Sequence, residues 1–117
     1  YYHKERYFKR KTIREWCSSQ YPEDGNYRGI GFDRRRFRDT IASANRPYYY
    51  AQSASNKGFG HSGFTGTMVW ADPKEDLVFV FLSNRVYPTR RNKVYFKLNP
   101  RTKCHEAAYE AIRRYKK

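Results

Sequence analysis

Two strongly apolar runs, joined by a short polar turn, stand in the middle of the chain. Residues 64–71 alternate in part between apolar and other side chains, as in a half-buried strand. Residues 77–82 (LVFVFL) are apolar throughout, as expected of a central strand covered on both faces. The polar turn between them, from Asp72 to Asp76, suits a tight antiparallel connection. The pattern therefore predicts a central hairpin within residues 58–85.

Helical periodicity is clearest at the C-terminal end, where we expect a helix over residues 99–116. Asn99 is a good capping residue, and Pro100 suits the first helical position. His105 lies outside the predicted apolar stripe and is expected at the surface. The stripe recurs at helical spacing and consists of Cys104, Ala108, Ala111, Ile112 and Tyr115.

Upstream, the pattern is weaker. Thr12 followed by Glu15 reads as a capping box and predicts a short helix ending near Gln20. Residues 27–33 (YRGIGFD) predict a short strand, and residues 34–56 a long connector around Pro47 and the adjacent tyrosines.

Together these elements predict a single domain over residues 1–117. The expected fold is of the α+β class, with an antiparallel sheet of about three strands and the C-terminal helix packed on it. A sheet covered on both faces needs more helices than the two predicted. We therefore expect that parts of the fold lie outside this chain, and the start at Tyr1 without a methionine leads to the same expectation of a fragment.

The charge balance is strongly basic, with 25 Lys and Arg against 11 Asp and Glu and a formal net charge of +14. The cations are dispersed along the whole chain, so nucleic acid is not the expected partner. A small basic module that binds nucleic acid or another polyanion remains the alternative interpretation.

We expect no membrane span, because no apolar run is long enough. Two cysteines, Cys17 and Cys104, are too few for a zinc site and are expected to be buried thiols.

Candidate chemistry gathers at the start of the central region, where glycines flank His61 and Ser62. Glycine lets a ligand approach the backbone, an imidazole can act near neutral pH, and a backbone N–H can bind an oxyanion. The plainer interpretation is that this is the glycine-rich start of a strand, and that its histidine makes ordinary hydrogen bonds and has no catalytic role. Neighbouring residues on a strand point to opposite faces, so His61 and Ser62 cannot serve each other as base and nucleophile.

The stretch FGHSGFTGTMVWADPKEDLVFVFLSNRVYPT resembles the C-terminal part of the serine β-lactamase and penicillin-binding-protein-like family. It is closest to the β-lactamase-related esterases and hydrolases. In that family a Lys-Thr-Gly triad, often His-Thr-Gly or His-Ser-Gly in the related hydrolases, lies on the strand at the active site. His61-Ser62-Gly63 matches the triad, and the resemblance extends over residues 8–114.

The resemblance implies a role for each residue of the triad strand. His61 would hold a substrate carboxylate or assist proton transfer, Ser62 would bind substrate, and Gly63 would let it approach. The Phe64 N–H would be one of two oxyanion donors. Histidine in place of lysine weakens the permanent charge, which favours ester or peptide hydrolysis over recognition of a β-lactam carboxylate. The resemblance implies no cofactor and no metal.

The family's nucleophile box, Ser-x-x-Lys, is absent from this sequence, since no serine is followed by lysine at the third position. No catalytic set is therefore complete, and we expect this chain alone to be inert. The expected partner is the missing N-terminal, helical part of the same protein, or a second copy bound through the sheet face. The complete protein would act on an acyl or peptide-like substrate. Its family is common in bacteria and implies a periplasmic or exported location.

Overall fold

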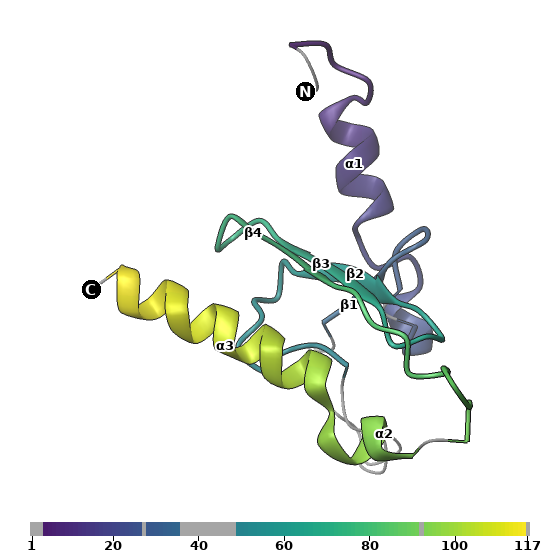
Figure 1. Cartoon of the computed structure of the whole chain (residues 1–117). Helices are drawn as coiled ribbons and strands as arrows, with labels where there is room; N and C mark the ends of the chain where they lie inside the picture. The colour runs from purple at the N-terminus through teal and green to yellow at the C-terminus, as the bar shows by residue number, and fades with distance from the viewer. Residues whose placement is uncertain (1–3, 27, 36–48, 92, 117) are drawn as a thin grey trace.

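The computed structural model describes residues 4–26, 28–35, 49–91 and 93–116. Four strands form one antiparallel sheet in chain order, and a long C-terminal helix lies along one of its faces (Figure 1). The predicted α+β class, with a helix packed on an antiparallel sheet, is confirmed. The elements are α1 (Arg10–Trp16), a 3-10 turn (Pro22–Asp24), β1 (Asp33–Arg34), β2 (Phe59–Ser62), β3 (Met68–Asp72), β4 (Leu77–Phe81), α2 (Val94–Leu98) and α3 (Pro100–Tyr115).

The central region contains two hairpins that share β3. The β3–β4 hairpin, with its turn at residues 73–76, is the one that the sequence predicts. The segment Phe64–Thr67, predicted as the start of a strand, is instead the turn between β2 and β3. Gly63 N–H donates to the Thr67 carbonyl and Gly66 N–H to that of Gly63, with Gly66 at φ +98°. This left-handed backbone favours glycine and reverses the chain.

The expectation that residues 77–82 are covered on both faces is wrong for the structure described. β4 is an edge strand. Phe79 and Phe81 pack against the core, whereas Val78 and Val80 are 70% and 58% exposed. The described elements cover the side of the sheet next to α3. We call the exposed surface formed by Val69, Val78 and Val80 the valine face.

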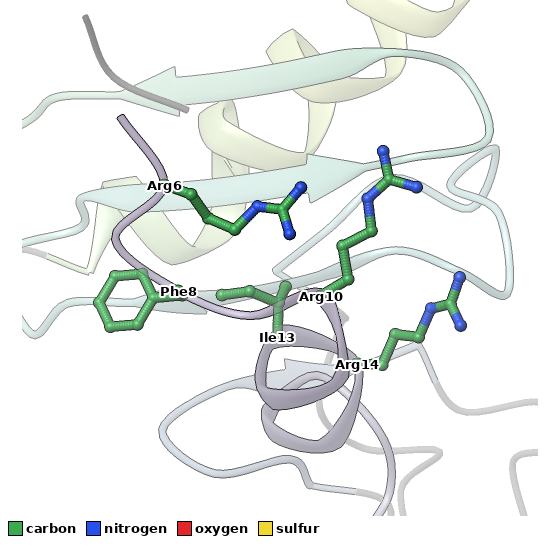
Figure 2. A pocket seen from close by; sticks show the side chains of 5 residues that line it. All are labelled: Arg6, Phe8, Arg10, Ile13 and Arg14. Carbon is green, nitrogen blue, oxygen red and sulfur yellow. The ribbon is translucent and has the colours of Figure 1, made fainter. Parts of the chain in front are cut away.

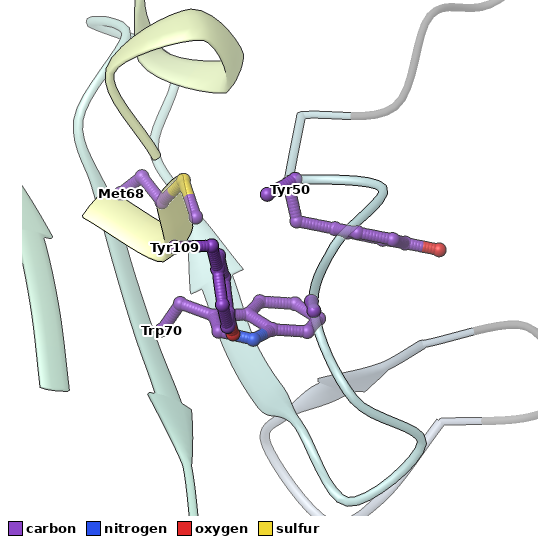
Figure 3. Packing of buried hydrophobic residues seen from close by; sticks show 6 residues of the cluster. Tyr50, Met68, Trp70 and Tyr109 are labelled. Atoms are coloured by element: carbon purple, nitrogen blue, oxygen red, sulfur yellow. The ribbon is translucent and has the colours of Figure 1, made fainter. Parts of the chain in front are cut away.

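The core is small and aromatic, and it fills the space between the sheet and α3 (Figure 3). Trp70 is fully buried and stacks on Tyr50, with 4.6 Å between ring centroids. Met68 and Tyr109 complete the contact from β3 and α3. Tyr50 belongs to the connector predicted over residues 34–56, which thus contributes to the core; Pro47 and Tyr48 lie outside the described residues.

The α3 helix begins as predicted, but its buried side is displaced from the predicted stripe. His105 and Tyr109 are 0% and 2% exposed, whereas Tyr115 is 93% exposed and Cys104 is an exposed thiol. The surface position predicted for His105 and the buried position predicted for Cys104 are both wrong. Two polar rings can enter the core because each finds a partner there: Ala51 N–H donates to His105 Nδ1, and Tyr109 donates to Asp72.

The upstream elements are shorter than the sequence suggests. Helix α1 starts at Arg10 with Lys9 as its N-cap and no side-chain capping bond, so the Thr12–Glu15 capping box does not form. Of the strand expected over residues 27–33, residue 27 lies outside the described residues, and within residues 28–35 the strand is Asp33–Arg34. Helix α2 has no counterpart among the elements that the sequence predicts. Among the described residues, no helix has both the length and the apolar composition that crossing a membrane requires.

Candidate active site

Strand β2 carries the first two residues of the candidate site on opposite faces of the sheet. His61 pairs with Val69 of β3 and is exposed, so it lies on the same side as the valine face. Ser62 pairs with Met68, whose side chain is buried under α3. The alternation confirms that these two side chains cannot act on each other as base and nucleophile.

On the exposed side, His61 lies in a short chain of polar contacts. Arg28 Nη2 is 3.1 Å from His61 Nε2, and Arg28 Nε is 2.9 Å from Asp33 Oδ1. The hydroxyl of Tyr49 donates to the other oxygen of Asp33 at 2.8 Å. Burial first, and then the neighbouring Asp33, raise the pKa of Tyr49 well above its usual range, so this phenol stays protonated. The structure thus places an arginine, braced by a carboxylate, against the histidine of the triad.

The turn after β2 leaves the backbone N–H of Phe64 available as a donor. Gly63 N–H is used within the turn, where it donates to Thr67 O at 2.9 Å. Phe64 N–H donates no hydrogen bond within the part of the chain that the structure describes. A donor of this kind is what binding of an oxyanion requires. A Cβ on Gly63 would collide with Thr67 Oγ1, so a larger residue here would force the Thr67 side chain to move.

Contacts from the following segment hold this turn in place. Arg85 N–H and the Ser83 hydroxyl both donate to Thr65 O, and the Tyr95 hydroxyl of α2 donates to Gly66 O at 2.6 Å. The Arg85 guanidinium lies 4.5 Å from the ring centre of Phe64 and 4.7 Å from that of Phe96. Arg85 is therefore an anchor of the turn.

Two other residues with perturbed pKa values, Asp72 and His105, are buried between the sheet and α3, away from His61. Asp72 is 1% exposed and accepts hydrogen bonds from Ser55 N–H, Ser55 Oγ, Lys74 N–H and Tyr109 Oη. Burial opposes its ionisation, but these bonds outweigh burial and hold the pKa of Asp72 below its usual range. Burial lowers the pKa of His105 to about 4. We assign both residues to the core rather than to the site.

A concave and strongly basic region lies beside α1. A cavity of about 450 Å³ is lined by Arg6, Phe8, Arg10, Ile13 and Arg14 (Figure 2). A neighbouring cavity of about 480 Å³ shares Ile13 and Arg14 and adds Arg34 and Lys57. We call the two cavities together the basic groove. No carboxylate of the described residues lines either cavity.

Among the residues that the structure describes, no group of three or more His, Cys, Asp or Glu side chains is placed to hold a metal ion. The sequence points to the triad strand, but it does not single out Arg28. The only signal is its place in the segment Arg28-Gly29-Ile30-Gly31-Phe32-Asp33, which the resemblance includes. The contact with His61 spans 33 residues, so spacing along the chain cannot reveal it.

The comparison with known families agrees with this geometry. The family model described as Beta-lactamase matches residues 14–99, which is more than half of the chain and includes the triad strand, the turn and β4. No curated protein and no solved structure matches the chain. The chain belongs to the β-lactamase family, as the resemblance of its triad strand to the serine β-lactamases and penicillin-binding proteins indicates.

Proposed function

We propose that this chain forms one wall of the active site of a serine hydrolase that cleaves an acyl or peptide-like substrate. His61 would face the substrate from the exposed side of the sheet, and Ser62 would bind it from the end of β2. Gly63 would let it approach the backbone, and Phe64 N–H would supply one of two oxyanion donors. The nucleophile would come from a Ser-x-x-Lys box on another part of the protein, because this sequence contains none. The observation that carries the proposal is the unbonded Phe64 N–H directly after the triad strand of a β-lactamase-family chain.

The valine face supports a second part of the proposal. Val69, Val78 and Val80 are 43%, 70% and 58% exposed and lie on the same side of the sheet as His61. An apolar surface beside a candidate site is typical of an interface. We propose that the helical part carrying the nucleophile covers this face, which would place its serine near Phe64. Self-association through the same face is the alternative and would leave the site without a nucleophile.

Catalysis should therefore depend on complementation. The chain alone is expected to hydrolyse neither nitrocefin nor p-nitrophenyl acetate. Hydrolysis should appear when it is co-expressed with the upstream coding segment that carries a Ser-x-x-Lys box. Hydrolysis by the chain alone would contradict the proposal, as would an inert complex of the two parts.

A pair of variants tests the oxyanion role within the active complex. Phe64→Pro removes the backbone N–H and should lower kcat by roughly 10²- to 10³-fold, the usual effect of losing one oxyanion donor. Phe64→Ala keeps the N–H and removes only the ring that rests on Arg85, so its kcat should change far less. Equal losses in the two variants would mean that Phe64 matters through its ring and not through its N–H.

The basic groove favours polyanion binding as a second candidate function. Its walls combine Arg6, Arg10, Arg14, Arg34 and Lys57 with the half-exposed ring of Phe8. A positively charged groove with an aromatic platform is typical of single-strand binding. If this function holds, affinity for a fluorescent oligonucleotide should fall steeply between about 50 and 200 mM salt. The double variant Arg10→Gln/Arg14→Gln should weaken binding, whereas Arg113→Gln/Arg114→Gln on α3 should not. Equal effects would mean that binding depends on the net charge of the chain and not on the basic groove.

A further inference from the structure

The hydrogen bonds of His61 determine which of its nitrogens carries the proton. Arginine has only donors, so the contact at 3.1 Å requires that Arg28 donates and His61 Nε2 accepts. The other nitrogen, Nδ1, lies 3.0 Å from the carbonyl oxygen of Ser62, which can only accept. Both contacts are satisfied by one form alone, the neutral imidazole with its proton on Nδ1. An imidazolium would turn an N–H toward the guanidinium, which carries a charge of the same sign.

Arg28 is itself held in place. Its Nε donates to Asp33, and Asp33 in turn accepts a hydrogen bond from the half-buried phenol of Tyr49, whose ring packs against Trp70. A guanidinium has five N–H donors, and the contacts with Asp33 and His61 use two of them. The side chain is 55% exposed, so part of the guanidinium remains open to solvent next to His61.

We infer that Arg28 is a specificity-determining residue of this wall: it fixes His61 as a neutral hydrogen-bond acceptor and presents the positive charge that selects an acyl substrate bearing an anionic group. The inference rests on the proposed function and assigns the charge to a residue outside the triad. Arg85, another guanidinium close to the turn, is already held against the rings of Phe64 and Phe96.

The form of His61 can be read in the chain as it exists, without any catalysis. Long-range ¹H–¹⁵N NMR spectra of the histidine-labelled protein at about pH 8 separate a protonated ring nitrogen from an unprotonated one. We expect His61 to show a protonated Nδ1 and an unprotonated Nε2. Arg28→Leu should shift the population toward the Nε2–H form, whereas Arg28→Lys, which keeps a donor and a charge, should retain the Nδ1–H form.

An exposed arginine on another element provides the matched control. Arg114→Leu removes the same charge from the end of α3 and should leave both His61 signals unchanged. An Nε2–H signal in the unsubstituted chain would overturn the inference. So would an Arg28→Leu spectrum identical to that of the unsubstituted chain.

Anion selection is tested with acetate, and acetamide serves as its uncharged counterpart. Acetate should perturb the Arg28 Nε–H and His61 signals, and acetamide should not. The acetate response should be lost in Arg28→Leu and kept in Arg114→Leu; a response that survives in Arg28→Leu would overturn the assignment. These measurements need no nucleophile, so the inference can fail while complementation succeeds, and the proposed function can fail while the His61 form is as expected.

Discussion

Replacing Asp72 by alanine is expected to lower the free energy of unfolding by about 3–5 kcal/mol. The carboxylate accepts hydrogen bonds from Ser55, Lys74 and Tyr109, and no Lys or Arg pairs with it among the described residues. Its removal leaves buried donors on the connector and on α3 without an acceptor. Since domains are stable by only about 5–15 kcal/mol, this is a large fraction of the total. Urea unfolding, followed by the fluorescence of buried Trp70, should show a midpoint lower by roughly 2 M.

Two further variants separate the hydrogen bonds of Asp72 from a general effect of charge. Tyr109→Phe removes one donor and nothing else from the network, so it should cost about 1–2 kcal/mol. Asp24→Ala removes an exposed carboxylate from the 3-10 turn and should stay within about 0.5 kcal/mol. If Asp72→Ala were no more harmful than Asp24→Ala, the network would have no part in stability.

The chain should also lose stability when the pH falls from about 6.5 toward 4, because His105 is buried without charge. Burial lowers its pKa to about 4, whereas an unfolded histidine titrates near 6.5. In this window the unfolded state binds the proton first, so protonation favours unfolding. The stability is fully present above about pH 6.5, and the shift corresponds to a loss of about 3 kcal/mol once the pH falls below the folded pKa. Urea unfolding at a series of pH values measures this slope.

The variant His105→Asn isolates the contribution of His105 to the pH dependence of stability. An asparagine oxygen can still accept from Ala51 N–H, but it does not titrate, so the pH slope should largely disappear even though the variant is less stable at neutral pH. A slope that survives in His105→Asn would assign the acid sensitivity to other groups.

Much of the fold could be predicted because local pattern and tertiary structure agree there. The β3–β4 hairpin has apolar strands around a polar turn, and α3 begins with Asn99-Pro100. The buried side of α3 could not be predicted from hydrophobicity. His105 and Tyr109 are stabilised in the core by partners 54 and 37 residues away, and those partners are invisible to a helical stripe of apolar residues.

Neither the exposure of β4 nor the role of Arg28 could be predicted, and the reasons are related. The sequence LVFVFL is apolar on both sides of the strand, but which side is covered depends on elements elsewhere. Strand β4 is an edge in the described structure, so its valines are exposed. For the candidate site, the His-Ser-Gly motif was enough to identify the strand. The contact between Arg28 and His61 is visible only in the three-dimensional structure.

The anchoring of the turn after β2 has a consequence for assembly. Ser83, Arg85 and Tyr95 fix residues 64–66 through contacts made entirely within this chain. The conformational entropy of ordering that loop is therefore lost when the chain folds, and association with another part does not have to supply it again. A binding partner would meet a rigid, preorganised surface. Its affinity should therefore depend mainly on how well the partner's own surface complements this turn.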